Sequence, residues 1–68
     1  MTALPRLYAK GYSKTDGETP VTLWNLGSYR YEIEARKSKF YTECEVFESS
    51  YEDAMIKFEK MVDKVELV

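Results

Sequence analysis

Glutamate side chains offer most of the chemistry in this sequence. Four of them occupy alternate positions in two neighbouring stretches, as Glu32, Glu34, Glu43 and Glu45. Paired carboxylates act as general acids and bases when their surroundings move one pKa away from the other. Exposed carboxylates instead bind basic groups on a partner molecule. The fold decides between these two chemistries, because burial is what raises a carboxyl pKa toward the neutral range.

Other catalytic and ligand-binding groups are scarce. The 68 residues include no histidine and a single cysteine, Cys44, so the commonest general base and the commonest zinc ligands are missing. The three glycines, Gly11, Gly17 and Gly27, lie too far apart to form a phosphate-binding loop. We therefore expect a protein that is not an enzyme and that uses no cofactor and no metal.

An alternating pattern predicts that the carboxylates lie on a β-hairpin over residues 29–46. Apolar and charged side chains alternate strictly over residues 29–36, and a second alternating run covers residues 40–47. A four-residue turn over residues 36–39 would place one set of side chains on a single inward face. That set is Tyr29, Tyr31, Ile33, Ala35, Phe40, Thr42, Cys44 and Val46. In this register Cys44 is a small buried hydrophobic residue.

An amphipathic helix is predicted over residues 50–65, with Ser49 or Ser50 as its N-cap. At 100° per residue its apolar side chains form one stripe. The stripe comprises Tyr51, Ala54, Met55, Phe58, Val62 and Val65, with Met61 at its edge. Upstream, residues 7–12 fit a strand, and residues 21–26 fit a strand or a short helical turn, of which we favour the strand. The fold class is therefore α+β in one domain, residues 1–68: a small antiparallel sheet of three or four strands with one C-terminal helix packed on one face.

The outward face of the predicted hairpin is the candidate binding site. Glu32 lies opposite Glu43 in this register, and like charges that face each other destabilise a sheet, which suggests a functional reason for them. Tyr41 and Phe47 add aromatic anchors of the kind that interfaces use. The expected partner is another protein with a basic surface, and the alternative is a solvated polar face that prevents edge pairing. The candidate residues are Arg30, Glu32, Glu34, Tyr41, Glu43, Glu45 and Phe47.

Nucleic-acid binding is the main alternative function. Arg36, Lys37 and Lys39 crowd the predicted hairpin tip. The strands followed by a helix that opens within residues 47–54 resemble the arm-site-binding domains of tyrosine recombinases. This resemblance implies a sheet face inserted into the major groove of DNA. Carboxylates on that face would repel phosphates, so nucleic acid is the less favoured partner. A structural subunit that self-associates, for example as a homodimer, is a further alternative.

Charge and hydropathy indicate where the protein acts. The net charge is −2, the single cysteine fits a reducing compartment, and no stretch is apolar enough to cross a membrane or to act as a leader. We therefore expect a cytoplasmic protein. Compact, acidic, cofactor-free chains of this length resemble accessory proteins of phages and mobile elements. This resemblance implies that the chain inhibits a host enzyme or a defence complex.

Overall fold

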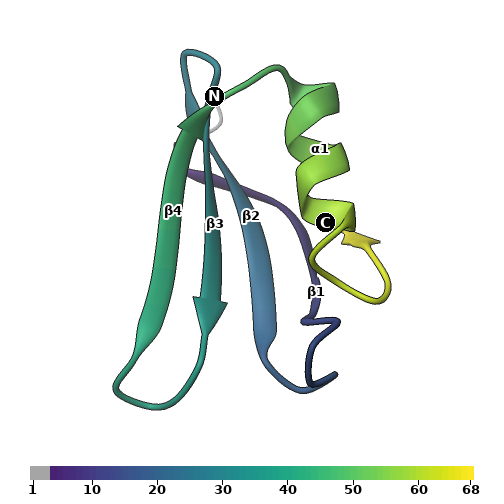
Figure 1. The fold of residues 1–68 in the computed structure, drawn as a ribbon. Helices are drawn as coiled ribbons and strands as arrows, with labels where there is room; N and C mark the ends of the chain where they lie inside the picture. Colours follow the sequence, from purple (N-terminus) through teal and green to yellow (C-terminus); the bar gives the residue numbers. More distant parts are fainter. Residues whose placement is uncertain (1–3) are drawn as a thin grey trace.

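The computed structural model describes residues 4–68, which form one antiparallel sheet and one helix (Figure 1). In chain order the elements are β1 (Arg6–Tyr12), β2 (Pro20–Gly27), β3 (Arg30–Arg36), β4 (Thr42–Glu48), α1 (Tyr51–Glu59) and β5 (Glu66–Leu67). The strands lie in the order β4-β3-β2-β1-β5. The α+β fold with one C-terminal helix is therefore confirmed. The sheet has five strands because the last residues add a short strand beside β1.

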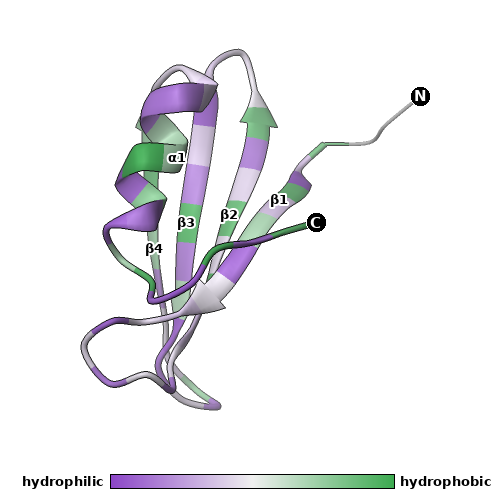
Figure 2. Cartoon of the chain, turned by 90° about the vertical axis from the view of Figure 1, so that its right-hand side faces the viewer, coloured by the Kyte–Doolittle hydropathy of each residue, from purple (hydrophilic) through white to green (hydrophobic). Residues whose placement is uncertain are grey.

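The hydrophobic core lies between α1 and one face of the sheet (Figure 2). The helix contributes Ala54 and Phe58, both completely buried. The sheet contributes Ala9, Val21, Leu23, Tyr31, Ile33 and Ala35, and the segment after the helix adds Val62. Strands β2 and β3 alternate buried and less buried residues, as expected for strands covered on one face only. The opposite face of the sheet has no covering element within residues 4–68.

Strand β2 settles the ambiguity over residues 21–26 in favour of the strand. Strand β1 contains a β-bulge, because Leu7 pairs with Trp24 while Ala9 pairs with Leu23. The extra residue, Tyr8, lies on the helix side, where its ring packs 6.2 Å from the ring of Tyr31. The bulge thus sends two consecutive residues of β1 to the same side of the sheet, where both pack against the core.

The helix is shorter than its sequence pattern predicts. It begins after Ser50, whose side chain accepts a hydrogen bond from the Asp53 N–H, and it ends at Glu59 instead of residue 65. Beyond the helix the chain turns back to β1. There Val62 forms a β-bridge with Ser13, and the Asp63 N–H donates to the Tyr12 carbonyl at 3.0 Å. Pairing with the edge of β1 therefore replaces the last turns of the predicted helix.

The register of the hairpin formed by β3 and β4 differs from the prediction by three residues. The connection covers residues 37–41 instead of a four-residue turn. Ala35 consequently pairs with Glu43, where the sequence pattern predicts Phe40. Because this shift is odd, each side chain of β4 lies on the opposite side of the sheet from its predicted one.

Five of the eight residues predicted to point inward are therefore wrong. Tyr31, Ile33 and Ala35 are buried as predicted. The β4 side chains that were expected inward are instead exposed, and Phe40 lies in the connection with 96% of its surface accessible. The exposed residues of this set in β4 are Thr42, Cys44 and Val46. Tyr29 is also exposed, because it forms the two-residue turn between β2 and β3, in which Ser28 and Tyr29 have φ of 53° and 58°.

The loop between β1 and β2 is organised by the Asp16 carboxylate. It accepts hydrogen bonds from the Glu18 N–H at 2.8 Å, the Thr19 N–H at 2.9 Å and the Thr19 hydroxyl at 2.5 Å. These bonds, led by that of the Thr19 side chain, lower the pKa of Asp16 from 3.8 to about 2. Gly17 follows with a φ of 69°, a turn conformation that glycine adopts without strain.

We expect Asp16→Ala to lower the melting temperature at neutral pH, because two N–H groups and a hydroxyl lose their acceptor. Asp16→Asn should lower it less, since one amide oxygen still accepts. A depressed pKa stabilises the fold above the unfolded-state value and loses this effect as the pH falls. The difference between wild type and Asp16→Ala should therefore shrink between pH 3.8 and about 2. Thermal melts followed by circular dichroism measure it, and Glu18→Ala serves as the exposed control. A difference that stays constant over this range would contradict the assignment.

Candidate binding surface

The structure divides the seven candidate residues between the two sides of the sheet. We call the uncovered side the outer face and the side packed against α1 the helix side. Arg30, Glu32 and Glu34 of β3 belong to the outer face. Glu43, Glu45 and Phe47 of β4 lie on the helix side, because they pair with the buried residues of β3. Tyr41 precedes β4, and its hydroxyl lies 3.3 Å from Oε2 of Glu43.

On the helix side, Lys57 of α1 binds two of these residues at once. Its Nζ donates to Oε2 of Glu45 at 2.7 Å and lies 4.4 Å from the centroid of the Phe47 ring. The Phe47 ring in turn stacks on Tyr31 with a centroid distance of 6.4 Å. An ion pair with a cation–π contact at a half-exposed site stabilises only modestly. Phe47 and Glu45 therefore fix β4 to the helix instead of presenting an outward anchor.

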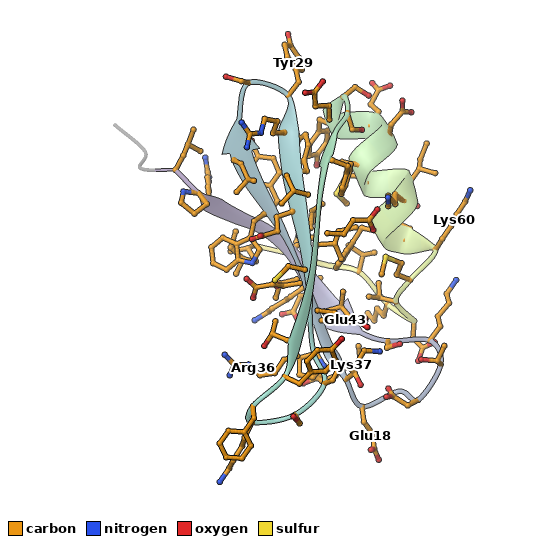
Figure 3. The ribbon with its side chains drawn as sticks, turned by 60° about the vertical axis from the view of Figure 1, so that its left-hand side comes forward. Glu18, Tyr29, Arg36, Lys37, Glu43 and Lys60 are labelled. Atoms are coloured by element: carbon orange, nitrogen blue, oxygen red, sulfur yellow. The ribbon has the colours of Figure 1, made fainter. Side chains whose placement is uncertain are left out.

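Glu43 lies near the tip of the hairpin, also on the helix side. Its Oε1 is 3.8 Å from Nζ of Lys37. Figure 3 shows Glu43 and Lys37 on the helix side of the hairpin, with Arg36 on the other side. The predicted pairing of Glu32 with Glu43 does not exist, because Glu32 lies opposite Val46. The like-charge repulsion that suggested a functional reason for these residues is thus absent at this pair.

The outer face consists of rows of side chains that cross the sheet. One row runs from Leu7 through Trp24 and Glu32 to Val46. A second row runs from Lys10 through Thr22 and Glu34 to Cys44. The Trp24 indole N–H donates to the Thr22 hydroxyl at 3.0 Å, which ties the two rows together and fixes the ring. Trp24 is the largest side chain of these rows and is only half-buried.

Charges on the outer face are balanced, with the carboxylates at the centre. Glu32 and Glu34 lie in the two crossing rows. Glu48 pairs with Arg30 at one end of β3, and Arg36 lies at the other end. The face is therefore less acidic than the sequence indicates, since Glu43 and Glu45 have moved to the helix side. What remains is a central acidic band beside an indole ring, with basic residues at its margins.

Cys44 shares the outer face with Glu32 and Glu34, and one ligand atom from each lies within 4.8 Å of the others. Desolvation and the two carboxylates raise the pKa of the Cys44 thiol. The protonated thiol is a weak nucleophile and a weak metal ligand. Cys44 is exposed, contrary to the prediction that it is a buried hydrophobic residue. Glu32 and Glu34 make this part of the face acidic, which favours a basic partner.

Trp24 is not among the seven candidate residues predicted from the sequence. The signal was present, because residues 21–26 read as a strand place Val21 and Leu23 on one side and Thr22 and Trp24 on the other. The ambiguity between strand and helical turn hid that alternation.

Within residues 4–68 no helix is long and apolar enough to span a membrane. Comparisons with protein-family models, curated proteins and solved structures gave no match.

Proposed function

We propose that this chain is a small, non-enzymatic protein-binding module that docks through its outer face. The observation that carries the proposal is the uncovered row of Leu7, Trp24, Glu32 and Val46, which crosses four strands. A half-exposed tryptophan flanked by Leu7 on one strand and Glu32 on the other combines the aromatic, apolar and charged groups found in protein interfaces. A strand-borne site is also rigid before binding, so that little conformational entropy is lost on association.

The chemistry of the face favours a partner that presents a basic side chain. Glu32 lies directly beside Trp24, so a lysine or arginine of the partner would meet a carboxylate and the face of an indole together. The basic residues Lys10, Arg30 and Arg36 lie at the margins and would orient an acidic rim on the partner. The form of this function that we favour is inhibition of a host enzyme or defence complex by a phage or mobile-element accessory protein.

Two variants of the outer face test the proposal. Trp24→Ala removes the central ring, and the pair Glu32→Lys with Glu34→Lys reverses the acidic band. We expect either variant to weaken partner binding at least tenfold, which corresponds to about 1.4 kcal/mol. The wild type and both variants are immobilised, and captured proteins are identified by mass spectrometry. The affinity for the captured partner is then measured by calorimetry with each variant.

The matched control is Glu18→Lys with Glu59→Lys, which makes the same change in net charge at exposed positions away from the outer face. Capture of the same proteins in the same amounts by all four chains would overturn the proposal. Retention of the wild type on duplex DNA at low salt, lost on raising the salt, would favour the nucleic-acid alternative instead. The DNA-binding experiment is informative because two of the four carboxylates that were predicted to repel the phosphates, Glu43 and Glu45, lie on the helix side instead of the outer face.

A further inference from the structure

Strand β4 is a seven-residue edge of the sheet, and its backbone faces solvent on one side. The Ser49 N–H donates to the Tyr29 carbonyl at 2.8 Å, and the Lys37 N–H donates to the Tyr41 carbonyl at 3.0 Å. Odd-numbered residues of β4 therefore direct their N–H and C=O groups toward β3. Even-numbered residues direct theirs away from the sheet, because these directions alternate along a strand. The outward-directed residues are Thr42, Cys44, Val46 and Glu48.

The opposite edge of the sheet is covered. Strand β5 pairs with β1 at Ala9 and Lys10, and the bridge between Ser13 and Val62 continues the pairing. Within residues 4–68 the chain thus closes one edge with its own C-terminal residues and leaves β4 open. An open edge is a template for a further strand from another polypeptide.

A hollow of about 300 Å³ on the helix side lies against this open edge. Ile33, Ala35 and Met61 give it an apolar floor, and Glu43 and Glu45 of β4 line it with carboxylates. Each carboxylate already has a lysine partner, Lys37 at 3.8 Å and Lys57 at 2.7 Å, but both pairs are exposed enough for a cation of the partner to share the carboxylate. Lysine and arginine side chains have the matching character, since they place an aliphatic stem on apolar surface and a cationic head beside charged groups. A strand added to β4 would direct every second side chain to this side of the sheet.

We propose that the free edge of β4 receives an extended polypeptide segment as a sixth strand, with a lysine or arginine of that segment in the hollow beside Glu43 and Glu45. This inference rests on the proposed function only in that the ligand is a polypeptide. It uses a different surface from the Trp24 row, and it specifies how the partner binds and which side chain it presents.

Charge argues against a second copy of this chain as the added strand. Residues Thr42–Glu48 contain Glu43, Glu45 and Glu48 and no lysine or arginine. Two copies of β4 side by side would bring six carboxylates onto neighbouring strands, and like charges across strands are destabilising. Acidic edges also block self-association in natural sheets. A basic segment gains from the same carboxylates that repel a second copy.

The test uses a blocked seven-residue peptide in which lysine alternates with valine. Binding is followed by NMR of the full chain, as shifts and slowed exchange of the outward N–H groups of β4. We expect the matching peptide with glutamate in place of lysine to bind at least tenfold more weakly. A third peptide, N-methylated at the alternate amides that would face β4 when the lysines point to the helix side, keeps the side chains but cannot pair in the proposed arrangement, and it should also bind at least tenfold more weakly.

Protein variants locate the site. Cys44→Pro removes one outward N–H without removing a bond to β3 and should weaken binding at least tenfold, whereas Cys44→Thr keeps the N–H and serves as its control. Glu43→Gln with Glu45→Gln should weaken binding of the lysine peptide and strengthen binding of the glutamate peptide, because the carboxylates that attract the one and repel the other are neutralised. If Cys44→Pro fails to fold, the N-methylated peptide carries the same test.

Equal binding of the N-methylated and unmodified peptides would overturn the inference, and so would equal binding of the lysine and glutamate peptides. Self-association through β4, seen as concentration-dependent slowing of exchange at the same N–H groups, would assign the edge to a second copy instead. If the Trp24 variants leave partner capture intact while the lysine peptide still pairs with β4, the proposed outer face fails and the edge site stands. If the Trp24 variants lose partner capture while the lysine peptide does not pair with β4, the edge site fails and the proposed outer face stands.

Discussion

Phe58→Ala is expected to lower the free energy of unfolding by about 3–5 kcal/mol, the largest loss from any single substitution considered for this chain. Phe58 is completely buried and lies in the middle of the contact between α1 and the sheet. Removing its ring deletes apolar burial and leaves a cavity that the strands cannot fill. A domain of this size has a total stability of about 5–15 kcal/mol, so the substitution should remove a large share of it.

Urea titration followed by circular dichroism measures this loss. Ile56→Ala is the matched control, since Ile56 lies on the same helix with 49% of its surface exposed. Its unfolding free energy should change by no more than about 0.5 kcal/mol. Equal effects of the two substitutions would mean that the helix does not pack on the sheet through Phe58.

Gly11→Val is expected to have the second largest effect, a loss of about 1–3 kcal/mol from overpacking. A Cβ atom at Gly11 would lie 2.7 Å from the Lys64 carbonyl oxygen and 3.0 Å from Cβ of Val62. The first of these neighbours is backbone, which cannot rotate away. We therefore expect the substitution to push the C-terminal segment off β1 and to release the pairing of β5.

Hydrogen exchange locates this second effect. Exchange should accelerate at Asp63, which donates to Tyr12, and at Val68, which donates to the Tyr8 carbonyl at 3.0 Å. The amides of the hairpin formed by β3 and β4 should keep their protection in the folded fraction. Gly17→Ala is the control, because a Cβ atom there would meet only the Asp63 carboxylate, at an ordinary contact distance of 3.9 Å, and the φ of 69° is what opposes the change. Unchanged exchange at Asp63 and Val68 would contradict the close packing at Gly11.

Much of the fold follows from residue patterns that fit only one secondary structure with one buried face. The alternation in β3 gives a buried set of Tyr31, Ile33 and Ala35, and all three are buried. The helical stripe predicts the buried positions Ala54 and Phe58, and an N-cap is predicted at Ser49 or Ser50 and found at Ser50. In these segments local propensity and tertiary packing favour the same structure, so the pattern alone is sufficient.

The register of β4 could not be predicted because both of its faces are mixed. One alternate set contains Cys44 and Val46, and the other contains Phe47 with two glutamates. Hydrophobicity alone favours burying the first set. The fold buries the second set in part, because Lys57 neutralises Glu45 and covers Phe47, and because Phe47 stacks on Tyr31. These contacts come from another element and from another strand, and a strand pattern read by itself contains neither.

The end of the helix was mispredicted for a related reason. Val62 and Val65 continue the helical spacing, but Val62 is buried as part of a bridge to Ser13. The same apolar residue satisfies both structures. The bare edge of β1 decides between them, since its backbone groups need partners that a longer helix would not supply.

The single cysteine of this chain is exposed on the outer face, beside Glu32 and Glu34 and on the open strand β4. A fluorophore or spin label attached through its sulfur would therefore sit next to both proposed contact areas without any engineered attachment point. The raised pKa of the thiol implies that alkylation proceeds faster in mildly alkaline buffer. One labelled preparation would then report, by its emission or by its mobility, the moment at which either area becomes occupied.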